Sequence, residues 1–177
     1  LDSLVEDGKG IIIVPQSCMT GKTEEEASLK EKILEKHTLE GVITLNKDTF
    51  YGVGTLPCIA VFTAHQPHPE DKLVKFINFE DDGYKVFPHI GLVETESAID
   101  KKEHLLDVWF DRIDAESKFC VKSTVKPDDE WLHSFYYFND EIPTKEEFDK
   151  TVADYITFMV NMMSHNRGHL FEGEENE

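Results

Sequence analysis

The chain has 177 residues, of which 40% are hydrophobic and 31% are charged, a composition typical of a folded domain and not of a disordered tail. No apolar run approaches the roughly 20 residues that cross a bilayer, so we expect no membrane segment. The 36 Asp and Glu against 18 Lys and Arg give a net charge of −18, which argues against a free-standing nucleic-acid binder. Three separated cysteines, Cys18, Cys58 and Cys120, indicate neither a disulfide framework nor a zinc site and fit a reducing, cytoplasmic location.

The first part of the chain alternates between strand and helix signals. Residues 10–15, GIIIVP, form a β-branched run bounded by Gly and Pro, which predicts a strand buried on both faces of a parallel sheet. After a polar loop, Thr23 and Glu26 form a capping box that predicts a helix to about Lys36. Residues 39–46 predict the next strand, so the strand–helix–strand order indicates a right-handed parallel crossover.

Two more strands and a hairpin follow. Residues 56–64, LPCIAVFTA, predict a strand antiparallel to residues 39–46, because only a short glycine-containing connection joins the two. Residues 72–79 alternate in the manner of an edge strand. An Asp-Gly turn comes next, and we expect residues 84–87 to pair back onto that edge.

The pattern changes at about residue 95. Residues 98–114 carry apolar side chains at helical spacing, and Thr144 with Glu147 forms a capping box before a long amphipathic stretch. We therefore divide the chain into residues 1–95, the α/β part, and residues 96–177, a mostly helical extension with an acidic tail.

Two glycine motifs look like ligand-binding loops but are incomplete. Gly21-Lys22-Thr23 lies between a strand and a helix, yet a P-loop needs a glycine where Gln16 stands. Residues 50–54 read F-x-G-x-G, the letters of the cofactor loop in S-adenosylmethionine-dependent methyltransferases, but they lead into a strand and not a helix. We expect these glycines to serve the turn between two antiparallel strands.

Metal and nucleophile signals are also weak. His65 with His68, and His165 with His169, have chelating spacing, but neither pair has a nearby cysteine or a third ligand, so we predict no metal site. No G-x-S-x-G motif occurs, and no residue of this chain is predicted to be catalytic.

A family resemblance is carried by four segments that occur in order within residues 1–95: GIIIVPQSCM, ILEKHTLEGVITLNKDTF, YGVGTLPCIAVFTA and VKFINFEDDG. Together they resemble the second half of the catalytic domain of N6-adenine DNA methyltransferases. The modification (M) subunit of type I restriction-modification systems is the best match. Beyond about residue 95 the resemblance fades.

This resemblance implies an α/β fold, the C-terminal portion of a Rossmann-like class I methyltransferase sheet, with parallel strands plus an antiparallel strand and a helical extension. It implies DNA as the substrate, with the target adenine flipped out of the duplex because its amino group cannot be reached inside the stack. Phe50 matches the aromatic residue that stacks on the flipped base, and Tyr51 is a second candidate.

The departures from the family pattern concern the chemistry. The Asn/Asp-Pro-Pro-aromatic motif has no counterpart, because the seven prolines include no Pro-Pro pair, and the cofactor loop is missing. We expect a fragment that binds no S-adenosylmethionine and transfers no methyl group alone. In the intact enzyme that cofactor would be bound elsewhere, and the N-terminal part of the methyltransferase and the specificity subunit would be partners. The isolated chain is expected to self-associate through the sheet edge left uncovered.

Two other classes of function remain open from the residues. The acidic charge favours a self-sufficient protein-interaction module or a DNA-mimicking inhibitor. Buried parallel-type strands argue against a mimic, because such strands need covering neighbours. An α/β enzyme acting on a small molecule is the third alternative, which a pocket of convergent perturbed side chains would support. The DNA recognition sequence is not encoded in any of these signals.

Overall fold

The computed structural model describes residues 1–21, 23–139, 143–165 and 167. The chain forms two compact units, Leu1–Phe138 and Asn139–Glu177. None of the described helices is long and apolar enough to cross a membrane.

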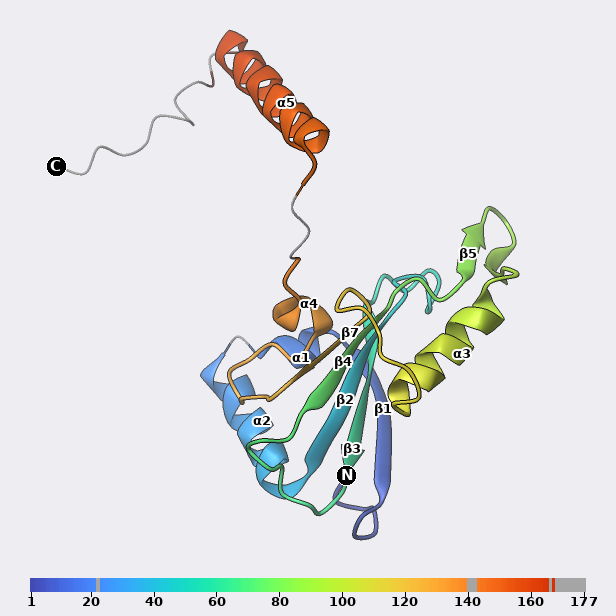
Figure 1. Cartoon of the computed structure of the whole chain (residues 1–177). Helices are drawn as coiled ribbons and strands as arrows, with labels where there is room; N and C mark the ends of the chain where they lie inside the picture. Colours follow the sequence, from blue (N-terminus) through green and yellow to red (C-terminus); the bar gives the residue numbers. More distant parts are fainter. Residues whose placement is uncertain (22, 140–142, 166, 168–177) are drawn as a thin grey trace, which may run out of the picture. The chain divides into compact units, whose positions relative to one another are not determined.

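The first unit is built on a five-stranded sheet with the order β1-β3-β2-β4-β7 (Figure 1). Its strands are β1 (Lys9–Pro15), β2 (Thr38–Leu45), β3 (Pro57–Thr63), β4 (Val74–Phe79) and β7 (Cys120–Ser123). Strand β3 is antiparallel to both β1 and β2, and β2 is parallel to β4, so β1, β2 and β4 run in one direction. The predicted antiparallel pairing of residues 39–46 with 56–64 is confirmed.

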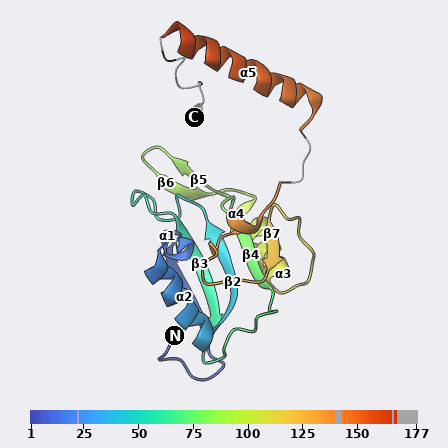
Figure 2. The same ribbon diagram turned by 90° about the vertical axis from the view of Figure 1, so that its left-hand side faces the viewer.

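Helices cover the two faces of this sheet (Figures 1 and 2). On one face lie α1 (Ser17–Thr20), α2 (Glu24–Lys36) and α4 (His133–Tyr136), and on the other lies α3 (Ala98–Trp109). The larger core cluster belongs to the first face and includes Leu39, Val42, Phe62, Phe76 and Trp131. The smaller cluster lies under α3, where Val108 packs against Ile43 and Ile77.

Local signals explain where the long helices begin. The Thr23 hydroxyl accepts a hydrogen bond from the Glu26 N–H at 3.2 Å, and the Glu26 carboxylate accepts one from the Thr23 N–H at 3.1 Å. The same reciprocal pair, Thr144 with Glu147, precedes α5 (Lys145–Ser164) in the second unit. Both predicted capping boxes are confirmed, because such caps depend only on residues three apart.

The prediction for residues 10–15 is wrong in its burial. Strand β1 lies at the edge of the sheet, and only β3 pairs with it among the described strands. Ile11 is 70% and Ile13 is 55% exposed, because α3 covers the part of that face formed by β2 and β4. The β-branched run therefore forms a strand, but one with an open edge and an open face.

Two strand assignments need correction. Residues 72–79 do not form an edge strand, because β7 pairs antiparallel with β4 on its outer side. Residues 84–87 do not pair back onto β4. They form β5 (Tyr84–Phe87), which pairs with β6 (Gly91–Glu94) in a separate two-stranded sheet. Both corrections concern which strands pair, and the alternation of apolar and polar residues within one segment does not specify its pairing partner.

The first unit continues past residue 95. Strand β7 belongs to its sheet and Trp131, fully buried, belongs to its larger core. Helix α3 ends earlier than residue 114, since Asp111 adopts a left-handed φ of 54° two residues after Trp109. The functional division into residues 1–95 and 96–177 stays a prediction. In the second unit, the described side chains of α5 include none that is buried.

Candidate functional site

The candidate site lies at the carboxyl ends of the three strands that run in one direction. Strands β1, β2 and β4 end at Pro15, Leu45 and Phe79, and ligands of open α/β sheets bind at this end. The connection of residues 46–56 and the β5–β6 hairpin both leave the sheet here (Figures 1 and 2).

Phe50 and Tyr51, the residues predicted to stack on a base, lie in the connection of residues 46–56. Phe50 is 42% and Tyr51 is 56% exposed, so neither ring is enclosed in the core. The Val53 N–H donates to the Phe50 carbonyl at 3.1 Å, and this hydrogen bond closes a turn that contains both aromatic residues. An exposed aromatic ring on a turn at the ligand end of a sheet is suited to stacking on a planar base.

The glycines of this connection have a conformational role. Gly52 and Gly54 have φ values of 82° and 70°, in the left-handed region that favours glycine. A Cβ added at either would meet no atom within 4 Å, so close packing does not require them. The connection leads into β3, which is antiparallel to β2, and this confirms that the F-x-G-x-G letters serve a turn between antiparallel strands.

Hydrogen bonds hold the connection at both ends. On the side of β1, the Gln16 N–H donates to the Leu56 carbonyl at 2.8 Å. On the side of β4, the Asn46 side-chain amide donates to Asp82 Oδ1 at 3.0 Å. Neither Asn46 nor Asp82 was predicted as a site residue. The sequence does show an Asn directly after one strand and an Asp-Gly turn after another. It does not indicate that these two residues contact each other.

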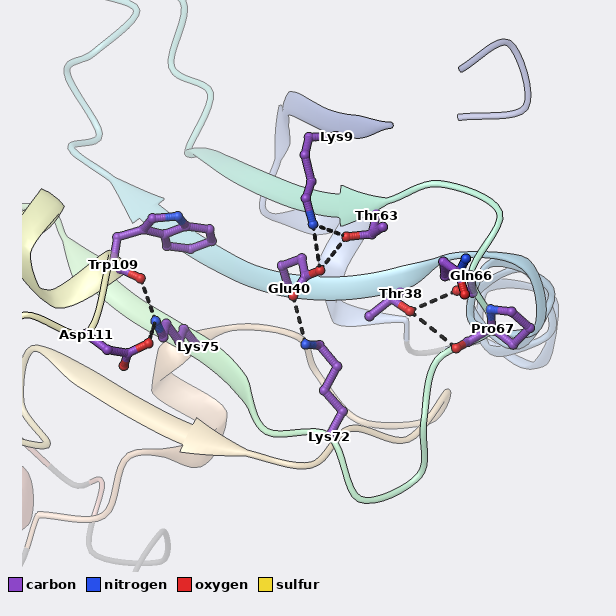
Figure 3. Close-up of polar contacts among 10 residues, drawn as sticks. All are labelled: Lys9, Thr38, Glu40, Thr63, Gln66, Pro67, Lys72, Lys75, Trp109 and Asp111. Atoms are coloured by element: carbon purple, nitrogen blue, oxygen red, sulfur yellow. Dashed lines mark hydrogen bonds and ion pairs between the residues drawn. The ribbon is translucent and has the colours of Figure 1, made fainter. Parts of the chain in front are cut away.

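A second polar cluster lies near the opposite end of the sheet (Figure 3). Glu40 accepts hydrogen bonds from Lys72 at 2.8 Å, from Lys9 at 3.1 Å and from the Thr63 hydroxyl. Partial burial raises the pKa of Glu40, but these three donors outweigh it and lower the pKa to about 2. Glu40 is therefore a permanently charged ion-pair partner at neutral pH, not a proton-transfer group.

The neighbouring charges are paired as well. Lys75 donates to the Trp109 carbonyl and to Asp111 Oδ2, both at 2.5 Å (Figure 3). Lys122 donates to Asp111 Oδ1 at 2.6 Å. Hydrogen bonds from these two lysines lower the pKa of Asp111 to about 2. These contacts tie the end of α3 to the sheet, so we assign this cluster a structural role.

The described histidines of the two spaced pairs contact other groups or are buried. Within the described part of the chain, no group of three or more His, Cys, Asp or Glu side chains is placed to hold an ion. His65 Nε2 donates to the Leu4 carbonyl at 2.8 Å, whereas both ring nitrogens of His68 are buried without a hydrogen-bond partner, and burial lowers its pKa. His165 is the C-cap residue directly after α5, and His169, like Lys22, lies outside the described residues.

Comparison with known proteins defines the class of protein to which this fold belongs. The family model described as N-6 DNA Methylase matches residues 1–157. The chain therefore belongs to the N-6 DNA methylase family. The match extends beyond residue 95, where the motif resemblance fades, and so takes in α3, β7, α4 and part of α5.

A curated relative supports the same family. The type II restriction enzyme and methyltransferase RM.BcgI of Heyndrickxia coagulans is 54% identical over 178 residues. The alignment covers 100% of this chain and 28% of the relative, so the chain spans little more than a quarter of that protein's length.

Solved structures show the same fold. A type I restriction-modification methyltransferase subunit from Streptococcus thermophilus matches with a TM-score of 0.59 and 18% identity, over 76% of this chain and 28% of that one. The M protein of the type I restriction enzyme EcoKI matches with a TM-score of 0.52 and 14% identity, over 99% of this chain and 43% of that one. The resemblance to adenine methyltransferases and type I M subunits is confirmed.

Proposed function

We propose that this chain forms the target-adenine side of the pocket in an S-adenosylmethionine-dependent DNA (adenine-N6) methyltransferase of a restriction-modification system. The observation that carries the proposal is the turn bearing Phe50 and Tyr51, exposed at the ligand end of a sheet in a member of the N-6 DNA methylase family.

The chemistry of the substrate explains why such a turn is needed. An adenine amino group inside a duplex is inaccessible, so the base must leave the stack and lose its stacking energy. An aromatic ring that stacks on the extruded base returns about 1–3 kcal/mol of this loss. Phe50 is the ring we assign to this contact, with Tyr51 beside it in the same turn.

Methyl transfer itself needs groups that these residues do not supply. The F-x-G-x-G turn runs from β2 into β3 and so lacks the helix N-terminus that a cofactor loop requires, and no Asn/Asp-Pro-Pro-aromatic motif occurs in the sequence. We therefore place S-adenosylmethionine binding and catalysis outside this chain and infer that the chain is inactive alone.

The partners in this proposal are the rest of the methyltransferase and a specificity subunit, with DNA bound by the assembly in the cytoplasm. The open edge of β1, with Ile11 and Ile13 exposed, supports a covering element from outside the chain. The charge of −18 supports a basic DNA groove formed elsewhere.

The test uses the intact methyltransferase that contains this chain. Phe50→Ala should lower methyl transfer roughly 5-fold to 150-fold, the equivalent of 1–3 kcal/mol. It should also reduce the fluorescence rise of 2-aminopurine placed at the target adenine, which reports base extrusion. Phe110→Ala is the matched control, because Phe110 is exposed just after α3 and away from the turn.

Unchanged methylation and unchanged fluorescence in Phe50→Ala would refute the stacking role. Tight binding of duplex DNA by the 177-residue chain alone at physiological salt would contradict the proposed division of labour and favour a self-sufficient binding protein.

A further inference from the structure

The side-chain amide of Asn46 makes two hydrogen bonds in different directions. Its Nδ2 donates to Asp82 Oδ1 at 3.0 Å, and its Oδ1 accepts from the Asp48 N–H at 2.9 Å. The second contact shapes the start of the connection that carries Phe50. The first reaches a segment 36 residues away in the sequence, after the end of β4.

Asp82 is itself held in place by its surroundings. The Oδ1 atom that accepts from Asn46 also accepts from the Tyr84 N–H at 2.9 Å. Next to it, the Gly83 carbonyl accepts from the N–H and the hydroxyl of Thr95, at 2.9 and 2.5 Å. A Cβ on Gly83 would lie 2.5 Å from Ala98 Cα, so this segment is packed tightly against the start of α3. Asp82 is thus a fixed acceptor.

We propose that Asn46 and Asp82 are positioning residues, whose hydrogen bond holds the Phe50 turn in the orientation that stacks on the extruded base. This inference rests on the proposed role of Phe50. It adds two residues that touch neither base nor cofactor and act through the placement of the ring.

The turn needs an external hydrogen bond because two of its residues are glycines. Gly52 and Gly54 adopt left-handed φ values with open space around them, so their own packing does not fix the turn. On the β4 side, the bond between Asn46 and Asp82 links the turn to a rigid element. Because a displacement of about 1 Å at a reacting group can cost up to about 100-fold in rate, loss of this link should lower turnover.

Three variants of the intact methyltransferase separate the bridge from its surroundings. Asn46→Asp keeps the acceptor for the Asp48 N–H but replaces the donor with a carboxylate that faces Asp82. Asp82→Asn keeps an Oδ1 acceptor for both Asn46 and Tyr84. The double variant N46D/D82N removes the repulsion between two carboxylates, and the new amide at 82 can donate to the new carboxylate at 46. This reversed bond turns the Oδ1 of residue 82 away from the Tyr84 N–H, because one oxygen accepts both bonds in the wild type.

We expect Asn46→Asp to lower kcat roughly 10-fold to 100-fold, with the KM for S-adenosylmethionine unchanged, and to weaken the 2-aminopurine signal. Hydrogen–deuterium exchange of residues 47–54 should become faster. Asp82→Asn should stay near wild type. The double variant should recover part of the turnover and of the exchange protection, because the regained bond to residue 46 is offset by the lost contact with the Tyr84 N–H. Asn78→Asp is the matched control, since Asn78 Oδ1 accepts from the Glu80 N–H at the end of β4 in the same way.

The positioning role of Asn46 and Asp82 would be overturned if Asn46→Asp showed wild-type exchange and wild-type turnover. It would also be overturned if the double variant were as impaired as Asn46→Asp. Failure of the bridge is distinguishable from failure of the proposed function. If Phe50→Ala is impaired and Asn46→Asp is not, only the bridge is wrong. If Phe50→Ala is itself silent, the stacking role is refuted and the positioning role with it.

Discussion

The ammonium of Lys30 lies 4.8 Å from the centre of the Trp131 ring and donates to the carbonyls of Met19 and Asp129, each at 2.7 Å. Lys30 is buried, and burial lowers its pKa, although the carboxylate of Asp129 opposes this. A Cβ at Gly21 would lie 2.4 Å from the Lys30 ammonium, which explains the glycine at that position. One side chain of α2 thus joins α1 to the segment before α4.

Lys30→Met should destabilise the chain by about 1–3 kcal/mol, because it removes two hydrogen bonds from a charged donor. The part-buried Asp129 carbonyl is left without that donor, whereas the Met19 carbonyl keeps the Trp131 N–H. Urea denaturation followed by Trp fluorescence measures this change. Lys32→Met is the control, since Lys32 is exposed on the same helix and its substitution should stay within about 0.5 kcal/mol. Equal midpoints for the two variants would show that the buried ammonium contributes no stability.

The Glu40 cluster predicts a pH dependence of stability. Because the folded-state pKa is about 2 and the usual value is 4.5, the stabilisation is complete above about pH 4.5 and is lost as the pH falls from there towards 2. Its size is on the order of 2 kcal/mol. Glu40→Gln should therefore be less stable than the wild type at pH 7, and the gap should narrow below pH 4.5. Denaturant midpoints at several pH values test this, and a gap independent of pH is the contrary result.

The open edge of β1 predicts self-association of the 177-residue chain. The backbone groups of β1 that pair with no described strand, together with the exposed Ile11 and Ile13, form a surface on which a second strand can pair. Size-exclusion chromatography with light scattering should show mass rising with concentration, and the Ile11→Lys/Ile13→Lys double variant should shift the chain to a monomer. Ile99→Lys, on the exposed side of α3, should not. A wild-type chain that stays monomeric at high concentration argues against this prediction.

The cysteines predict unequal thiol reactivity. Cys18 is exposed, whereas Cys58 is buried in β3 and burial raises the pKa of its thiol to about 12. Since the thiolate is the reactive form, Ellman's reagent should label Cys18 rapidly and Cys58 only after unfolding. The Cys18→Ser variant should lose the fast phase. Because Cys120 is half-buried, only rapid labelling that persists in the Cys18→Ser/Cys120→Ser double variant would show that the sheet interior is accessible.

Local sequence determined the elements whose stabilising partners are near in the chain. The capping boxes of α2 and α5 join residues three apart, and the antiparallel pairing of β2 with β3 follows from a connection of 11 residues, 46–56. The turn of residues 50–54 was predicted in the same way, because its glycines and the flanking strands are adjacent in sequence, whereas Phe50 and Tyr51 were singled out by the family resemblance. The family could also be predicted from the sequence, since the ordered motifs lie along one stretch of the chain.

Tertiary structure alone decided what depends on distant partners. That β4 is interior follows from pairing with β7, some 40 residues later, and that β1 is an open edge follows from which strands lie beside it. The contacts of Asn46 with Asp82 and of Lys30 with Asp129 join segments 36 and 99 residues apart. The physical reason is that hydrogen-bond pairing and burial depend on which segments meet in space, which periodicity within one segment does not encode.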